Sequence, residues 1–377
     1  MIPFNRPYTA GRELEYIQQA CARMHLSGDG EFTRRCHGLI EAATGTRKAL
    51  LTHSCTAALE MAAVLLDIGP GDEVIMPSYT FVSTANAFVL RGAVPVFVDI
   101  RADTLNIDEK LIEAAITDRT RAICVVHYAG VGCEMEAIQS IADRHGLHVI
   151  EDAAQGVGAS YKGRALGAIG RIGAVSFHET KNVISGEGGA ILLNDPALVE
   201  RAEIIREKGT NRTRFFRGEV DKYTWVDVGS SYLPGELVSA FLAAQLEQMD
   251  DITRRRIALW DRYDDWARIW ESRGTIRRPV VPADCIHNAH MFYILLPDSH
   301  ARIRFLAAMK EQGIGAIFHY IPLHSAPAGQ KYGRASGSMA ITDEYSGRIV
   351  RMPLWLGMEP EFDRILETTE RALEALA

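Results

Sequence analysis

The chain has 377 residues, of which 47% are hydrophobic and 24% are charged, and its formal net charge at pH 7 is −7. A chain of this length and composition can bury a large core, which excludes a disordered protein and favours one large domain with a smaller one. The net negative charge and the lack of a long basic tract exclude nucleic acid as the main partner, because binding to a phosphate backbone needs clustered lysines and arginines.

Three further features predict a cytoplasmic protein without membrane insertion. Residues 1–7 lack the charged stretch and apolar run of a secretory signal, and no uncharged apolar run of about 18 residues is present. The six cysteines show no Cys-x-x-Cys or Cys/His spacing. This scatter disfavours both a zinc site and a disulfide framework, so we expect no metal site and a reducing compartment.

Short apolar strands and helical patterns alternate from about residue 45 to residue 245. The expected strands are residues 49–51, 73–76, 94–98, 121–126, 147–150 and 173–177, and the expected helices include 56–66 and 135–145. Strands of this kind separated by helices predict a parallel sheet that is covered on both faces.

The pattern changes after about residue 234. A long charged helical pattern runs from Pro234 to about Trp270, and strand-like runs follow at residues 291–295 and 316–320. We therefore expect a large domain over residues 1–250 and a smaller α/β domain over residues 251–377.

An acidic residue and a lysine follow two of the expected strands. Asp152 comes directly after one strand, and Lys181 lies 29 positions later, shortly after another. In open parallel sheets the ligand binds beyond the carboxyl ends of the strands. A pyridoxal phosphate enzyme needs this pair, because the lysine holds the cofactor aldehyde as an imine and the carboxylate keeps the pyridine nitrogen protonated.

Each residue of this pair also has a plain structural interpretation. A lone lysine is usually a solvated surface charge, and an aspartate at a strand end often caps the next helix. Lys181, however, precedes the glycine-rich residues 186–189, where bare backbone allows close approach to a ligand. The two residues together favour the cofactor interpretation.

Other candidate residues follow the neighbouring strands. Residues 54–58 join a strand to a helix, so free amides at the helix start could bind an anion, with the Thr56 hydroxyl beside them, or Ser54 and Thr56 could form a plain cap. Phe81 could stack on a cofactor ring or pack in the core. Residues 156–161 imitate a dinucleotide fingerprint, but Tyr161 replaces the last glycine and no acidic partner follows, which excludes a nicotinamide site.

Five motifs together resemble the sugar aminotransferases of the DegT/DnrJ/EryC1/StrS family. They are residues 77–81, 152–155, 176–181, 186–189 and 319–324, and the resemblance runs from Pro3 to at least Pro353. More narrowly, residues 177–182, 206–212, 223–225 and 229–232 look like the branch of dTDP-4-amino-4,6-dideoxygalactose transaminases. Members of that branch aminate dTDP-4-keto-6-deoxyglucose with glutamate as donor, for surface polysaccharides such as enterobacterial common antigen.

The resemblance implies an aspartate-aminotransferase-like α/β fold (fold type I), with a mostly parallel seven-stranded sheet in the large domain and a smaller C-terminal α/β domain. It also implies pyridoxal 5'-phosphate as cofactor and a homodimer with shared active sites. Lys181 would bind the cofactor covalently, Asp152 would pair with the pyridinium nitrogen, and Gln155 would lie beside the ring hydroxyl. The phosphate would be held by Cys55, Thr56, Ala57 and Ser176, and Phe81 would stack on the ring.

Three implied contacts concern the partner subunit and the substrate. Ser231 occupies a position where many relatives carry an asparagine that reaches the neighbouring subunit's cofactor phosphate, so its contact is left open. His319 and Tyr320 would face the sugar nucleotide, although His319 could equally be a buried structural histidine.

The one basic cluster of the chain also has two interpretations. It consists of Arg201, Arg206, Lys208, Arg212, Arg214 and Arg217. Two or three of these side chains could bind the diphosphate of a nucleotide sugar, because guanidinium groups match phosphate geometry, or the cluster could be a solvated loop.

Rival functions are a transaminase of another 4-keto or 3-keto nucleotide sugar, a cofactor-binding sugar dehydratase and a non-catalytic sensor. The dehydratases replace the lysine with histidine, and a sensor should have lost Lys181, Asp152 or Gln155, whereas all three are present.

Overall fold

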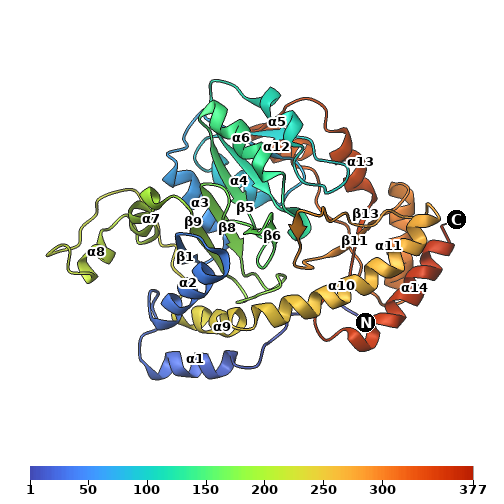
Figure 1. The fold of residues 1–377 in the computed structure, drawn as a ribbon, viewed down its shortest axis with the longest axis horizontal. Coiled ribbons are helices and arrows are strands. Elements are labelled where there is room, and N and C mark those ends of the chain that lie inside the picture. The colour runs from blue at the N-terminus through green and yellow to red at the C-terminus, as the bar shows by residue number, and fades with distance from the viewer. Residues whose placement is uncertain (377) are drawn as a thin grey trace.

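The computed structural model describes residues 1–376 and is built around one eight-stranded sheet (Figure 1). The strand order is β1 (Lys48–Thr52), β9 (Gly189–Leu193), β8 (Ile172–Ser176), β5 (His148–Asp152), β4 (Thr120–Val126), β2 (Glu73–Pro77), β3 (Val94–Val98) and β12 (Arg334–Ala335). Only β9 runs antiparallel to its neighbours, β1 and β8. The seven predicted strands of the large domain are therefore extended by β12, a two-residue strand that the C-terminal part adds beside β3.

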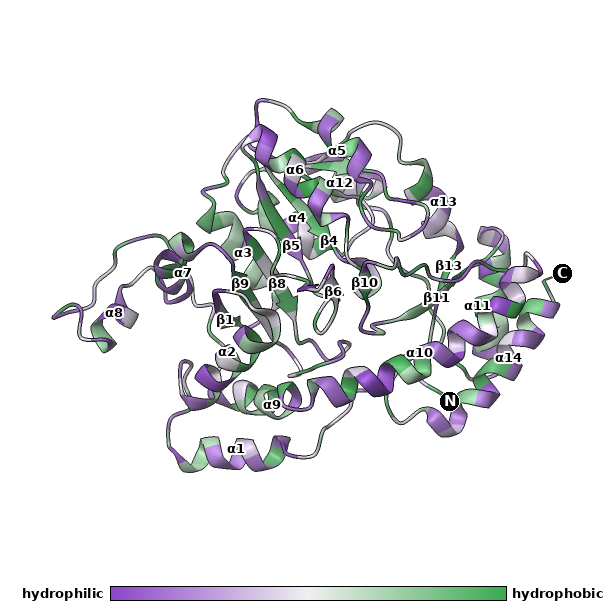
Figure 2. Cartoon of the chain, in the orientation of Figure 1, coloured by the Kyte–Doolittle hydropathy of each residue, from purple (hydrophilic) through white to green (hydrophobic). Residues whose placement is uncertain are grey.

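The middle residues of the central strands are apolar because both faces of the sheet are covered. In β4, Ile123 and Val125 pack into one hydrophobic cluster, whereas Ala122 and Cys124 pack into another. Successive side chains of a strand point to opposite faces, so this division marks the two layers. The central strands are correspondingly green in Figure 2.

Helices form a layer on each face of the sheet. One layer contains α1 (Glu13–Ala22), α2 (Glu31–Thr44), α5 (Glu109–Ala115), α6 (Met135–His145) and α9 (Glu236–Leu246). The other contains α3 (Cys55–Leu65), α4 (Val82–Val89) and α7 (Val199–Arg206). The short helix α8 (Arg212–Phe216) lies on an arm that projects away from the sheet (Figure 1).

The C-terminal part has a hydrophobic cluster of its own around α10 (Met249–Ser272). Its other elements are β11 (Phe292–Leu295), α11 (Ser299–Glu311), α12 (Pro327–Tyr332), α13 (Ala340–Arg348), β13 (Ile349–Met352) and α14 (Phe362–Glu374). A small sheet of β6 (Ser160–Tyr161), β7 (Arg164–Ala165) and β10 (Cys285–Ile286) links the two parts. Four 3-10 turns complete the described residues at Tyr128–Gly130, Pro196–Leu198, Leu323–Ser325 and Glu359–Glu361.

The predicted division at residue 250 stays a prediction. Helix α10 begins at Met249, close to the expected boundary. Yet Leu323 and Met339 pack into the cluster around α3, and β12 pairs with β3. Residues of the expected small domain therefore also complete one edge of the large sheet.

The expectation of one long helix from Pro234 to Trp270 was wrong. The structure has two helices, α9 and α10, with a break at Glu247 and Gln248. Glu247 at the break accepts a 2.8 Å hydrogen bond from the Tyr16 hydroxyl and forms an ion pair with Arg35. The two helices pack into different clusters, α9 into that of the large sheet and α10 into that of the C-terminal part.

The expected strand at residues 316–320 was also wrong. Ile317 forms a single bridge with Arg351, and no strand follows. Tyr320 has a φ of +28°, a conformation that does not continue a strand. Among residues 1–376, no helix combines the length and the apolar character that a membrane span needs.

Candidate active site

Most of the predicted site residues lie at or near the carboxyl ends of the strands of the sheet. Asp152 ends β5, Ser176 ends β8, and the β1 end leads into α3, whose first residues are Cys55, Thr56 and Ala57. These three strands run in the same direction, because β1 and β8 both oppose β9. Their carboxyl ends therefore meet, as the position of ligand sites in open sheets requires.

Asp152 is buried, and its orientation is fixed by two hydrogen bonds. Oδ2 accepts a 2.7 Å bond from the Thr84 hydroxyl, and Oδ1 accepts a 3.1 Å bond from the Ala154 amide. Burial nevertheless raises the pKa of Asp152 above its ordinary value, against these bonds and the charge of Lys181. The ionised carboxylate therefore needs a cation beside it.

Lys181 is partly buried and close enough to Asp152 for their charges to interact. Burial lowers the pKa of Lys181, and the positive charge of Arg351 lowers it further, while Cys55 and Asp152 oppose the shift. A lowered pKa increases the fraction of neutral amine, the form that acts as a nucleophile or base.

Ser54 caps the start of α3, as one of the two interpretations expected, and the amides of Cys55 and Thr56 have no hydrogen-bond partner among the described residues. The Ser54 hydroxyl accepts a 3.1 Å hydrogen bond from the Ala57 amide, and the Thr56 hydroxyl donates a 2.7 Å bond to Ser83. A Cβ atom on Gly189 would lie 2.4 Å from the Cys55 nitrogen, so only glycine lets β9 approach the helix start this closely. Free amides at such a helix start attract a phosphate group.

Gln155 is held between the large sheet and the C-terminal part. Its Oε1 accepts a 2.6 Å hydrogen bond from the Ala129 amide, and its Nε2 donates a 3.1 Å bond to the Tyr320 hydroxyl. Tyr320 adopts its positive φ at this contact, a backbone conformation that non-glycine residues adopt mainly where the surroundings enforce it.

His319 and Phe81 both lie near the Tyr320 ring. The buried His319 ring stacks on the Tyr320 ring at 3.5 Å between centroids, and its Nδ1 lies 2.8 Å from the Tyr128 hydroxyl. The Phe81 ring is 57% exposed and lies 6.3 Å from the Tyr320 ring. Phe81 is therefore available for stacking instead of being a core residue.

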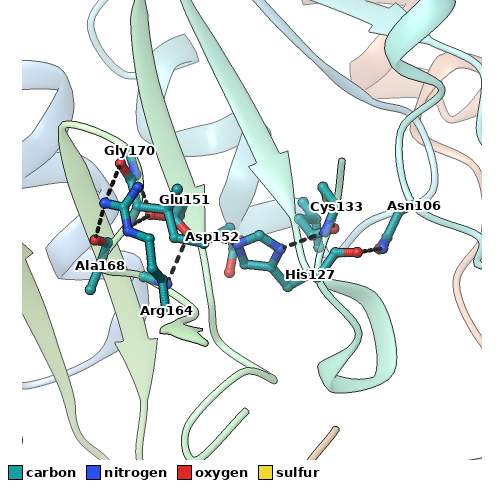
Figure 3. A network of polar contacts seen from close by, with 12 residues as sticks. Asn106, His127, Cys133, Glu151, Asp152, Arg164, Ala168 and Gly170 are labelled. Atoms are coloured by element: carbon teal, nitrogen blue, oxygen red, sulfur yellow. Dashed lines mark hydrogen bonds and ion pairs between the residues drawn. The ribbon is translucent and has the colours of Figure 1, made fainter. Parts of the chain in front are cut away.

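A buried hydrogen-bond network lies behind Asp152 (Figure 3). Glu151 accepts hydrogen bonds from His127 Nε2 at 2.8 Å and from the amides of Gly167, Ile169 and Gly170. His127 Nδ1 accepts a 3.2 Å bond from the Cys133 amide, so the ring proton belongs on Nε2. These donors lower the pKa of Glu151 although burial alone would raise it.

Ser231 lies apart from these groups. It is exposed, and its backbone forms a bridge with Glu207. Within residues 1–376, its side chain forms no hydrogen bond with a predicted cofactor residue. The single chain therefore leaves Ser231 facing outward.

The basic cluster is already paired with carboxylates. The ion pairs are Arg201 with Asp67 and Asp227, Arg206 with Asp29, Lys208 and Arg212 with Glu207, Arg214 with Glu200 and Glu219, and Arg217 with Glu203 and Glu219. This pairing favours the interpretation as a solvated loop over a diphosphate site in the single chain.

The donor set fits pyridoxal phosphate. A buried carboxylate that needs a cation suits a protonated ring nitrogen, a helix start suits the phosphate, and a lysine with a lowered pKa suits a covalent link to an aldehyde. These groups lie at or just after the carboxyl ends of β1, β5 and β8, which meet on one side of the sheet, so they can form one site.

Sequence reasoning missed two residues of this site, Thr84 and Arg351. Thr84 lies in the first turn of α4, directly after the segment 77–81 that was singled out, and this position could have indicated it. Arg351 is the one charged residue in the otherwise apolar strand β13. A charged residue in an apolar strand is a signal of a functional position, and this signal could have indicated Arg351.

The comparisons with known proteins agree with this geometry. The model of the DegT/DnrJ/EryC1/StrS aminotransferase family matches residues 7–370. The spore coat polysaccharide biosynthesis protein SpsC of Bacillus subtilis is 34% identical over 97% of this chain and 95% of its own length.

Two solved structures share the whole fold. The aminotransferase TlmJ from Streptoalloteichus hindustanus has a TM-score of 0.92 at 27% identity and covers 100% of both chains. S. venezuelae DesV, solved in complex with a ketimine intermediate, has a TM-score of 0.88 at 30% identity and covers 99% of this chain and 98% of its own. The matches confirm the predicted fold type I architecture with its largely parallel sheet.

Proposed function

Because this chain belongs to the DegT/DnrJ/EryC1/StrS aminotransferase family, we propose that it transfers an amino group from L-glutamate to dTDP-4-keto-6-deoxy-D-glucose. The products are 2-oxoglutarate and dTDP-4-amino-4,6-dideoxy-D-galactose, and the cofactor is pyridoxal phosphate. The observation that carries this proposal is the interaction of the buried Asp152 with Lys181 beside the anion-binding start of α3.

Asp152, Lys181 and the phosphate groups have separate roles in this proposal. Bound pyridoxal phosphate supplies the electron sink that stabilises the carbanion left when the donor loses its α-proton. Asp152, held in place by Thr84 and Ala154, would supply the negative charge that keeps the ring nitrogen protonated. Residues Cys55–Ala57, of which the Cys55 and Thr56 amides have no hydrogen-bond partner among the described residues, would hold the phosphate together with the Thr56 and Ser176 hydroxyls.

Lys181 moves the protons of both half-reactions. Its neutral Nζ takes the proton from the α-carbon of glutamate, and in the second half-reaction Nζ delivers a proton to the sugar carbon that receives the amino group. The lowered pKa of Lys181 favours the neutral form that the first of these transfers needs. Lys181 is therefore both the covalent anchor and the acid–base group.

The substrate assignment rests on the branch resemblance and on the surroundings of Tyr320. His319, Tyr320 and Phe81 form an aromatic group beside Gln155, and such a surface suits a sugar ring. The name of SpsC places that relative in spore coat polysaccharide biosynthesis. We propose surface polysaccharide of the enterobacterial common antigen type as the destination of the product.

The proposal includes a homodimer in which each chain completes the site of its partner. The arm around α8 carries the exposed side chains Phe216, Tyr223 and Trp225, of which Trp225 is 78% exposed. Exposed apolar side chains on a projecting segment favour contact with another chain. Ser231, at the foot of this arm, would then reach the partner's cofactor phosphate.

The test is to supply glutamate with a panel of nucleotide sugars and identify the products by mass and NMR. The panel contains dTDP-4-keto-6-deoxyglucose, its UDP and GDP counterparts and the 3-keto isomer. Formation of 2-oxoglutarate and the 4-amino galactose product with the dTDP sugar supports the proposal. Preference for another member of the panel keeps the transaminase and replaces the substrate. A deoxygenated product that keeps its keto group and carries no amino group, with glutamate oxidised to 2-oxoglutarate and ammonia, establishes a dehydratase.

A further inference from the structure

Arg351 carries a guanidinium group that has no hydrogen-bond or ion-pair partner among residues 1–376. Within residues 1–376, none of its side-chain N–H groups donates a hydrogen bond and it forms no ion pair, and its Nε is shielded from solvent. Leaving a cation unpaired away from water costs free energy. A residue of this kind in an apolar strand therefore indicates a missing anion.

The surroundings of Arg351 are aromatic or cationic. The Phe4 ring covers the guanidinium at 4.7 Å from its centroid. Tyr79, Tyr128 and Tyr320 also lie within its electrostatic reach. On the side of the active site, the charge of Arg351 acts on Lys181 and His319.

Other arginines, exposed or buried, differ from Arg351 in this respect. Arg206 donates to Asp29 at 2.7 Å and to the Leu51 carbonyl at 2.8 Å, and Arg201 forms ion pairs with two aspartates. The buried Arg256 donates to the carbonyls of Ala289 and His290. Arg351 is thus an unsatisfied guanidinium on a strand that pairs with Ile317, two residues before the site residue His319.

We propose that Arg351 binds the α-carboxylate of the amino donor, an inference that rests on the proposed transaminase function. In an α-amino acid the amino nitrogen and the carboxylate are attached to the same carbon. When the donor nitrogen takes the place of the Lys181 amine, its carboxylate must lie close to that position. A cation beside Lys181 meets this requirement.

The diphosphate of the sugar nucleotide fits this position less well. The sugar ring separates the diphosphate from the 4-keto carbon that must lie near Lys181, so a group that binds the diphosphate belongs farther away. A guanidinium also matches the two oxygens of a carboxylate with paired N–H groups. Arg351 therefore selects amino acids over simple amines as donors.

The experiment measures binding to the holoenzyme without turnover. The probe is α-methyl-L-glutamate, which has no α-proton to transfer, and its dissociation constant is taken from the absorbance change of the bound cofactor. The variants are Arg351→Gln and Arg351→Lys. Arg302→Gln is the matched control, because Arg302 also has an unpaired Nε but lies on α11 beside Phe318, outside the site.

Arg351→Gln is expected to weaken α-methyl-glutamate binding at least about 30-fold, because a charged partner of the carboxylate is removed. Arg351→Lys should lie between that variant and the wild type, since it keeps the charge without the paired geometry. Arg302→Gln should bind as the wild type does. Binding of 4-aminobutyrate, which lacks only the α-carboxylate, should be equal in the wild type and in Arg351→Gln.

Three results would overturn the inference, and a fourth would reject the proposed function on which it rests. If Arg351→Gln binds α-methyl-glutamate as tightly as the wild type, Arg351 does not bind the donor. If that variant instead weakens binding of the dTDP sugar to the aminated enzyme, its ligand is the diphosphate. A wild-type holoenzyme that responds to no amino acid rejects the proposed function itself, and a variant that loses its cofactor spectrum makes Arg351 a structural residue.

Discussion

Thr84 donates a 2.7 Å hydrogen bond from its hydroxyl to Oδ2 of the buried Asp152. The same hydroxyl lies 2.8 Å from that of Thr80, so a short chain of hydroxyls supports the carboxylate. A hydrogen bond to a charged group contributes about 1.5–3 kcal/mol. The orientation and the ionisation of Asp152 therefore depend on a residue of α4.

We expect Thr84→Val to slow the glutamate half-reaction about tenfold to a hundredfold, because the ionised Asp152 loses that contribution. Thr84→Ser keeps the hydroxyl and should stay within about threefold of the wild type. Single-turnover absorbance of the holoenzyme measures both rates. Equal rates for the valine and serine variants would show that Thr84 does not support Asp152.

Asp152→Asn should lower the activity of the holoenzyme without lowering the stability of the cofactor-free protein. Because the folded pKa of Asp152 is raised, its contribution to stability in the cofactor-free protein is present at low pH and is lost as the pH rises from about 4 through that pKa. The cofactor-free asparagine variant should therefore melt at the same or a higher temperature at pH 7, with a smaller loss of stability between pH 4 and 7.

The same variant should bind the cofactor yet turn over at least about a hundredfold more slowly, because the ring nitrogen loses its anionic partner. Thermal melts of cofactor-free protein and steady-state rates of holoenzyme provide the two measurements. A cofactor-free variant that melts well below the wild type at pH 7 would contradict the assignment of Asp152 as an unpaired buried carboxylate.

Glu151 should contribute to the free energy of unfolding and should take no direct part in the reaction. Its pKa is lowered in the fold, so its contribution is present above the ordinary glutamate pKa and is lost as the pH falls through the folded value. Glu151→Gln places an amide N–H₂ against donors of His127, Gly167, Ile169 and Gly170, and should cost about 2–4 kcal/mol at pH 7.

Urea unfolding at pH 7 and pH 4 measures this cost, with Glu136→Gln as the control. Glu136 is a surface carboxylate that pairs with Lys162, and its replacement should change the free energy of unfolding by less than about 1 kcal/mol. A similar, small cost for both variants would show that the network behind Asp152 is not a determinant of stability.

Much of this arrangement could be predicted from the sequence. The alternation of apolar runs and helical patterns located β2 to β5 and α6 within one or two residues, because fully buried strands and amphipathic helices have strong patterns. Asp152 and Lys181 could be found because each follows such a strand. Whether Asp152 and Lys181 share one site depends on the order of the strands in the sheet. That order cannot be read from the local sequence pattern.

The errors have physical causes too. The break between α9 and α10 depends on contacts of Glu247 with Tyr16 and Arg35, which are distant in sequence. The apolar run at residues 316–320 looked like a strand, but its side chains serve the site, with Tyr320 bonded to Gln155. Arg351 was missed because it stands out only by lacking a hydrogen-bond or ion-pair partner. Such partners can be identified only from the folded structure.

Gly189 tests the anion site at the start of α3. We expect Gly189→Ala to weaken pyridoxal phosphate binding at least about tenfold, because its Cβ would lie 2.4 Å from the Cys55 nitrogen and displace the helix start. Gly38→Ala is the control, since a Cβ in α2 meets nothing within 4 Å and should stabilise the helix by about 0.5–1 kcal/mol. Cofactor affinity from fluorescence titration of the cofactor-free protein distinguishes them.

The central claim is that Lys181 and Asp152 form the site of two linked amino-transfer half-reactions. The most direct test is the visible absorbance of the holoenzyme during addition of glutamate and then dTDP-4-keto-6-deoxyglucose, with Lys181→Ala in parallel. We predict that glutamate bleaches the band of the lysine-bound cofactor in the wild type, that the keto sugar restores it, and that the variant shows neither change. A wild-type band that no amino donor bleaches would contradict the account.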